Sequence, residues 1–133
     1  MTRDRFARLV EEALGHIPRR FRDAMQNVAV VVEDEPPREL LEELDMEPDE
    51  TLLGFYQGTP LPERSSSYGN TLPDRISIYQ IPVEDASEDD EEIRQCVVET
   101  LIHEFGHYFG MTEDEIEEIE EKYWRGESVD DLA

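Results

Sequence analysis

The feature that most constrains this chain is the stretch 101–110, which places two histidines and a glutamate on one predicted helix. It reads Leu-Ile-His-Glu-Phe-Gly-His-Tyr-Phe-Gly and contains the pattern H-E-x-x-H at His103, Glu104 and His107. Apolar residues recur around it with helical spacing, a serine and a run of acids precede it, and a glycine closes it. We therefore predict a helix over about residues 88–110, with an apolar face against the core and the histidines on the other face.

Histidines with this spacing indicate a metal site. Two imidazoles one helical turn apart can bind a single Zn²⁺ ion through neutral nitrogens, and the glutamate beside them need not be a ligand. Zinc acidifies a bound water, whose proton a carboxylate can take and pass to a leaving amine. We predict His103 and His107 as zinc ligands and Glu104 as the catalytic base of peptide hydrolysis. The alternative is a pair of surface histidines on an acidic helix.

A zinc site of this kind needs a third protein ligand. Gly110 permits a sharp turn three residues after the second histidine, and Glu113 follows three residues later, giving H-E-x-x-H-x-x-G-x-x-E. We predict Glu113 as the third ligand, with Asp114 as the alternative. Residues 112–115 also have the pattern of a helix capping box, a role compatible with metal binding. Weaker candidates are Glu117, Glu120 and Glu127.

The charge of the chain restricts its partners. In 133 residues there are 35 acids and 12 Lys or Arg, a formal charge of −23. Such a polyanion is not expected to bind nucleic acid or an anionic membrane, whereas metal cations and basic peptides are attracted. The sequence has no apolar run of signal-peptide or membrane-spanning length, and its one cysteine, Cys96, cannot form an intrachain disulfide. A cytoplasmic location is therefore expected.

Three short strands are predicted outside the helix. Residues 28–32 are a continuous apolar run, which predicts a central strand buried on both faces, and residues 52–57 predict a second strand. Residues 75–81 predict a third strand, ended by Pro82 and lying at an edge of the sheet. A peptide substrate could add to that edge in extended form beside the metal. The alternative is an ordinary edge protected by Arg75 and Pro82.

The remaining segments complete a small α+β fold. Helical spacing predicts short helices at both ends of the chain. Residues 58–74 are rich in Pro, Ser and Gly and predict a mobile loop, either a substrate lid or a merely flexible segment. Residues 126–133 are expected to be a frayed tail. We thus predict one domain over residues 1–133, with a small three-stranded sheet packed on the motif-bearing helix and short flanking helices.

These segments together resemble the small bacterial minimal zincin-like metallopeptidases. The resemblance rests on residues 52–58, on residues 73–79 and above all on residues 103–113. It implies a minimal zincin-like fold and a zinc ion held by the two histidines and an acid after the glycine, with the motif glutamate as general base. The family's third ligand is normally an aspartate. Here Glu113 stands at that position and Asp114 follows it.

The likeness to larger zincins ends after the third ligand. Those proteins place a methionine-containing turn below the metal, and no methionine follows Met111 in this sequence. We expect Tyr123 and Trp124 to pack below the site, or else to form part of the core or a homodimer contact. Two further functions stay open: a metal- or peptide-binding module without turnover, and an acidic protein that binds a basic partner.

Overall fold

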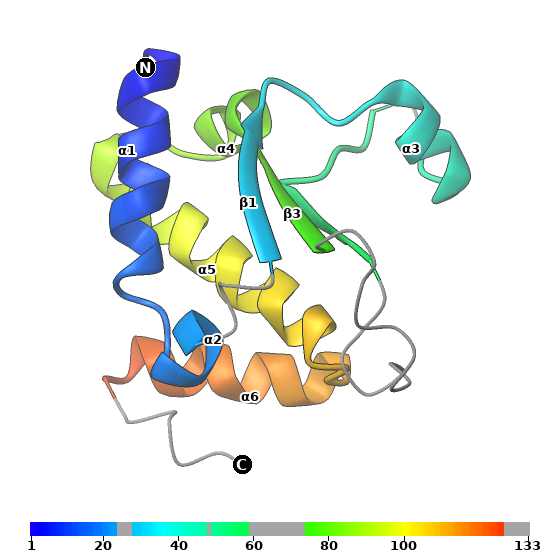
Figure 1. The fold of residues 1–133 in the computed structure, drawn as a ribbon. Helices are drawn as coiled ribbons and strands as arrows, with labels where there is room; N and C mark the ends of the chain where they lie inside the picture. Colours follow the sequence, from blue (N-terminus) through cyan, green and yellow to red (C-terminus); the bar gives the residue numbers. More distant parts are fainter. Residues whose placement is uncertain (24–27, 48, 59–73, 127–133) are drawn as a thin grey trace.

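The computed structural model describes residues 1–23, 28–47, 49–58 and 74–126. Within these residues it contains a three-stranded mixed sheet and six helices, which confirms the predicted α+β class (Figure 1). The elements in chain order are α1 (Arg3–Leu14), α2 (Arg19–Asp23), β1 (Val28–Glu33), α3 (Arg38–Glu43), β2 (Gly54–Gln57), β3 (Asp74–Tyr79), α4 (Gln80–Asp85), α5 (Asp90–Tyr108) and α6 (Glu113–Trp124).

The order of the strands differs from the prediction. The sheet has the order β1-β3-β2, with β1 parallel to β3 in a register that begins at Val28↔Asp74, and β2 antiparallel to β3 from Gly54↔Ile78. The expectation that residues 28–32 form the central strand is therefore wrong. The third strand along the chain, β3, lies between the other two and pairs with both. Of β1, only Val28 is buried. Here the apolar run indicated neither the burial of the strand nor which strands become its neighbours.

The expected edge strand at 75–81 is also wrong. The backbone groups of β3 bond to β1 on one side and β2 on the other, so no extended peptide can add to it. The strand ends at Tyr79. Residues 80 and 81, predicted as the end of the strand, belong instead to the helix α4. Pro82 lies in the first turn of this helix, where the missing N–H is no loss. The free edge on this side of the sheet belongs to β2.

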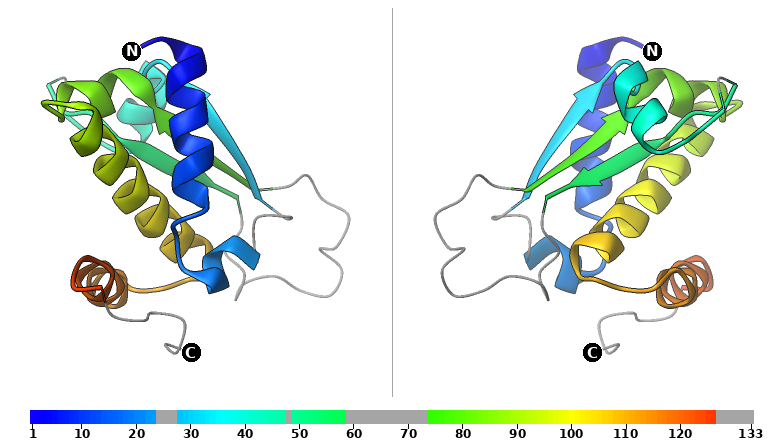
Figure 2. Two further views of the ribbon diagram at one scale, coloured as in Figure 1. Left: turned by 90° about the vertical axis from the view of Figure 1, so that its left-hand side faces the viewer. Right: turned by 90° about the vertical axis from the view of Figure 1, so that its right-hand side faces the viewer.

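The motif-bearing helix α5 packs against β2 and β3, and α1 packs against α5. In the two side views α1 lies on one side of the sheet and α3 on the other (Figure 2), while α6 turns back beneath α5 (Figure 1). The core fills the space between these elements with apolar side chains from α1, β3 and α5. Its members include Phe6, Leu9, Val10, Ala13, Ile76, Ile78, Val97, Val98, Leu101, Ile102 and Phe105.

Helix α5 is buried more completely than its sequence indicates. Thr100 and Glu104 are polar and lie close to the histidines around the helix, yet both are buried. Strand β2 covers them: a Cβ atom on Gly54 would lie 2.7 Å from Thr100 Cγ2 and 2.9 Å from Ser77 O. The glycine therefore lets strand and helix approach closely. Because the sequence does not reveal this approach, the buried side of α5 was underestimated.

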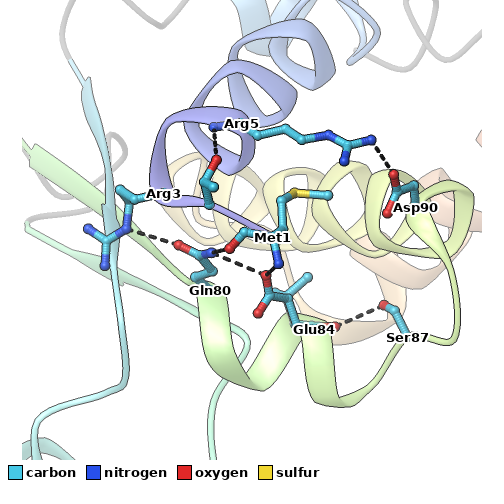
Figure 3. Close-up of polar contacts among 9 residues, drawn as sticks. Met1, Arg3, Arg5, Gln80, Glu84, Ser87 and Asp90 are labelled. Atoms are coloured by element: carbon cyan, nitrogen blue, oxygen red, sulfur yellow. Dashed lines mark hydrogen bonds and ion pairs between the residues drawn. The ribbon is translucent and has the colours of Figure 1, made fainter.

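Polar contacts tie the start of α1 to the elements that precede the motif (Figure 3). The amino group of Met1 lies 3.2 Å from Glu84 Oε1 on α4, and Gln80 Nε2 donates to the Met1 carbonyl at 2.9 Å. Arg5 pairs with Asp90 in the first turn of α5. Helix α5 begins slightly later than expected, with Asp89 and not Ser87 as its N-cap. These contacts fix where α5 starts.

Several predictions fall wholly or partly outside the described residues. Of the predicted loop 58–74, only Gly58 and Asp74 are described, and of the predicted tail 126–133, only Gly126. The single-domain organisation stays a prediction. Among the helices of the described ranges, none combines the length and the apolar character needed to cross a bilayer.

Candidate metal centre

Helix α5 presents the two motif histidines side by side. One turn separates them, so their rings lie on the same helix face, with centroids 4.9 Å apart and planes at 73°. Both are half-buried, with 35% of the His103 side chain and 38% of the His107 side chain exposed. Each ring is thus held by the helix while one edge stays accessible to a ligand.

A tight turn after His107 brings the next helix back to the histidines. Gly110 has a φ of 74°, a left-handed conformation that glycine adopts without strain. Its N–H donates to His107 O, and the N–H of Met111 donates to Gly106 O, both at 3.0 Å. This is the Schellman pattern of helix termination, which satisfies carbonyls at the end of α5. The prediction that the helix stops at Gly110 is confirmed. The turn brings the first residues of α6 close to the two histidines.

In the first turn of α6, one glutamate caps the helix and another faces the histidines. Thr112 Oγ1 accepts from the N–H of Glu115, and the Glu115 carboxylate accepts from the N–H of Thr112. Glu115 therefore caps the helix, and Glu113 is left to reach the histidines. Its two carboxylate oxygens lie 3.5 Å from His103 Nε2 and 3.3 Å from His107 Nε2. The structure brings Glu113, and not Asp114, to both imidazoles.

The distances from Glu113 to the two histidines fit a shared zinc ion. Zinc bonds to nitrogen and oxygen ligands are about 2.0–2.1 Å long, so neighbouring ligand atoms in a tetrahedron lie about 3.3–3.5 Å apart. The Glu113 oxygens stand at 3.3 and 3.5 Å from the two Nε2 atoms. Two histidines and one carboxylate are also a donor set found in catalytic zinc sites, where the fourth position stays open. The residues present are therefore suitable for zinc.

Glu104 lies next to the histidines but in a different environment. One ligand atom from each of His103, Glu104 and His107 can be chosen within 4.8 Å of one another, so Glu104 is close enough to serve the same centre. It is only 8% exposed, and its Oε1 accepts a hydrogen bond of 2.7 Å from the backbone N–H of Tyr56 on β2. Burial raises the pKa of Glu104 to about 7, against the opposing effect of that hydrogen bond. A carboxylate with this pKa can both take and release a proton near neutral pH.

A second acid from α6 supports His103 from behind. Glu120 Oε1 lies 3.2 Å from His103 Nδ1, the nitrogen that faces away from Glu113. This contact is the main cause of the raised pKa of His103. Burial, helped by the nearby His103, lowers the pKa of His107. The two histidines therefore differ: one has a carboxylate partner on its second nitrogen, and the other is more easily kept neutral.

Some contributions to the site were missed from the sequence. Glu120 was considered only as a weak ligand, although its position two helical turns after Glu113 places both on one face of α6. The Tyr56 N–H is a backbone group, and the sequence carries no signal for it. Of the other residues with a side chain able to bind metal, His16 is exposed and Cys96 is half-buried, and neither belongs to the group of possible ligands found among the described residues.

The aromatic pair at the end of α6 only partly fits its expected place. The rings of Tyr123 and Trp124 meet edge to face at 5.1 Å. Tyr123 is partly buried against the hydrophobic core, whereas Trp124 is 46% exposed. The core role proposed for Tyr123 is therefore supported, and a homodimer contact through Trp124 stays a prediction.

Comparisons with known proteins identify the family of the chain and a similar fold. The family model described as zincin-like metallopeptidase matches residues 25–123. A solved structure of a conserved hypothetical protein from Thermus thermophilus is similar, with 24% identity and a TM-score of 0.55 over 82% of this chain and 94% of that one. At this identity the likeness shows the fold alone. No curated protein matches the chain. Because the family model covers most of the sequence, including the whole of the candidate centre, the chain belongs to the zincin-like metallopeptidase family.

Proposed function

We propose that this protein is a zinc-dependent peptidase in which His103, His107 and Glu113 hold the metal and Glu104 is the general base. The observation that carries the proposal is the position of the Glu113 carboxylate, 3.5 and 3.3 Å from the two Nε2 atoms, beside a buried glutamate. When bound, zinc lowers the pKa of a water molecule and polarises a substrate carbonyl. The other groups needed for hydrolysis come from the chain itself.

Glu104 is suited to move the proton. Hydrolysis of a peptide bond adds the oxygen of water to the carbonyl carbon and a proton to the departing amine, so one group that accepts and then donates this proton serves both steps. In the metal-free protein, burial raises the pKa of Glu104 to about 7, so both of its protonation states are within reach near neutral pH. The hydrogen bond from Tyr56 N–H orients its carboxylate, and the same bond stabilises the ionised form that accepts the proton.

The substrate is expected beside β2. The N–H of Tyr56 points away from β3 and reaches Glu104 on α5, so the outer edge of β2 faces the motif helix. A peptide in extended form that pairs with this edge passes next to Glu104 and the histidines. Strand β2 thus takes the place that the sequence assigned to residues 75–81.

A calorimetric zinc titration of the metal-stripped protein tests the centre. We expect one tight site in the wild type that is lost in His103→Ala, at a pH near 7 where imidazoles are largely neutral. His16→Ala is the matched control, because it removes the third histidine of the chain from an exposed position outside the site. Zinc binding that is equal in His103→Ala and His16→Ala would contradict the proposed ligands.

Turnover needs a separate experiment. Zinc-loaded protein is incubated with a synthetic peptide library that contains all residue types, and products are identified by mass spectrometry. Cleavage that stops on zinc removal and returns on zinc addition supports the peptidase. Tight zinc binding without any cleavage would instead favour a metal-holding module on the same scaffold.

A further inference from the structure

A pocket of about 350 Å³ opens beside the candidate metal centre. One wall is the segment 51–54, which leads into β2, and the other is the stretch of α5 just before the motif. His103 and Glu104 form its inner end, and Glu120 from α6 lines it as well. The pocket is therefore continuous with the groups that would act on a substrate, and it lies on the N-terminal side of the histidines along α5.

The walls of this pocket combine apolar and acidic groups. Leu52 and Leu53 are half-buried on one side, and Cys96 is half-buried on the other. Besides Glu104, two further carboxylates, Glu99 and Glu120, line the same space. Among the residues that the structure describes, no lysine or arginine contributes to the lining. A side chain with a long apolar stem and a positively charged end matches these walls, since lysine and arginine bury their stems and keep the charged group near water.

Glu99 is the carboxylate in the pocket that lacks a partner. Glu120 already contacts His103 at 3.2 Å, and Glu104 accepts from Tyr56 N–H. Glu99 is exposed and has no hydrogen bond or ion pair with the residues that the structure describes. Partial burial and the negative charge of Glu120 raise the pKa of Glu99, against the opposing effect of His103. A cationic ligand in the pocket would oppose this shift, because a positive charge nearby favours the ionised carboxylate.

We propose that this pocket receives a lysine or arginine side chain of the peptide substrate, and that Glu99 is the residue that selects its positive charge. The inference rests on the proposed peptidase function for the identity of the ligand. The pocket, its apolar walls and the unpaired carboxylate on α5 do not depend on that function. Glu120 adds negative charge to the pocket while it contacts His103.

Binding of two matched small molecules tests the pocket without any turnover. Nα-acetyl-arginine amide and Nα-acetyl-citrulline amide have nearly the same shape, but only the first is charged. They are titrated into isotope-labelled protein, metal-stripped and zinc-loaded, at low ionic strength, and amide shifts are followed by NMR. We expect shifts centred on residues 96–100 and a dissociation constant roughly fivefold lower for the arginine compound, the range of a partly exposed ion pair.

Two variants separate local recognition from overall charge. Glu99→Gln is expected to remove the difference in affinity between the two compounds. Glu118→Gln changes the net charge equally but lies on α6 in an exposed pair with Lys122, and it should keep the difference. Equal binding of both compounds to the wild type would overturn the proposal. So would a preference for arginine that survives in Glu99→Gln, or one that is lost equally in Glu118→Gln.

The cleavage profile distinguishes failure of the pocket from failure of the peptidase. If zinc-loaded protein cuts the peptide library, we expect Lys and Arg to be enriched at one position next to the cut bond, and the enrichment to fall in Glu99→Gln. Cleavage without such enrichment would contradict the proposed role of the pocket but would support the peptidase function. Binding of the arginine compound that depends on Glu99, in a protein that cuts nothing, supports the pocket and counts against the peptidase.

Discussion

The two helices that build the candidate centre hold their functional side chains in contrasting ways. Glu104 on α5 is 8% exposed, whereas the side chain of Glu113 on α6 is 68% exposed. On α5 the relative positions of the two histidines and the glutamate follow from helical periodicity alone. On α6 the position of Glu113 depends on the turn at Gly110 and on how closely the two helices pack. One half of the site is a local property, and the other half is a property of the fold.

The difference has a physical consequence for each kind of residue. A buried carboxylate loses hydration, and this is why the pKa of Glu104 rises to about 7. Glu113 is largely solvated, and its carboxylate oxygens lie opposite two imidazole nitrogens. We therefore expect a change at Glu104 to act on the chemistry and a change at Glu113 to act on metal affinity.

The largest effect is expected from Glu104→Gln on α5. The amide keeps the size of the side chain and can still accept from Tyr56 N–H, but it cannot take a proton. We expect the hydrolysis rate to fall by a factor of about 10²–10⁴, the usual contribution of a general base, with zinc affinity little changed. Steady-state cleavage and zinc calorimetry on one preparation measure both. Retained turnover would remove Glu104 from the mechanism.

Replacement of the acids at the start of α6 tests the other half of the comparison. Glu113→Ala removes the carboxylate that faces both histidines, and we expect zinc affinity to fall more than about 100-fold, beyond the range of groups that only support a ligand. Asp114→Ala is the matched control, since it removes a neighbouring charge from the same helical turn. A larger loss in Asp114→Ala than in Glu113→Ala would reassign the third ligand.

Glu120→Gln should weaken zinc binding less. Its carboxylate contacts the second nitrogen of His103 and favours the tautomer that leaves Nε2 free to bind metal. We expect a loss of about 10–100-fold in zinc affinity, as for other carboxylates that support a zinc-bound histidine. Nitrogen chemical shifts of His103 in the metal-free protein report the tautomer directly. An unchanged tautomer and an unchanged affinity would make the contact incidental; Glu118→Gln is the control.

The burial of Glu104 predicts a dependence of stability on pH in the metal-free protein. Its pKa is about 7 in the folded state and 4.5 in the reference state, so folding favours the protonated form. This contribution is fully present below about pH 4.5 and is lost as the pH rises through about 7. In urea unfolding, the free energy of unfolding of the wild type should fall by about 1–3 kcal/mol more than that of Glu104→Gln as the pH rises from about 4.5 to about 7. If the free energies of unfolding of the two proteins changed with pH in parallel, the buried state of Glu104 would be contradicted.

The smallest effect is expected where the two helices meet. A Cβ atom on Gly106 would lie 2.5 Å from Cγ1 and 2.8 Å from Cδ1 of Ile116, which is fully buried. Gly106→Ala should therefore cost about 1–2 kcal/mol of stability, the strain of overpacking less the gain in helix propensity. Adding Ile116→Val, which removes one crowded atom, should recover part of the loss. Chemical denaturation measures both, and a stabilised Gly106→Ala protein would contradict the close packing.

Most of the site was predictable because its signals are local. The spacing of His103, Glu104 and His107 follows from one helix, and Gly110 marks the end of that helix by its own backbone preference. Glu113 was preferred to Asp114 as the third ligand; its carboxylate lies near both histidines, and its role as a ligand stays a prediction. The helix α4 was missed because Pro82 was interpreted as the end of a strand, although proline is equally at home in a first helical turn.

The sequence by itself determined the α+β class, the helix that carries the motif and the chemical identity of the candidate ligands, because periodicity and residue type are properties of neighbouring residues. Only the tertiary structure decided that β3 is central and β2 forms the edge beside α5, that β2 buries Glu104, and that Glu120 reaches His103. These features join segments far apart in the chain. Their positions follow from packing of the whole fold, which no local pattern records.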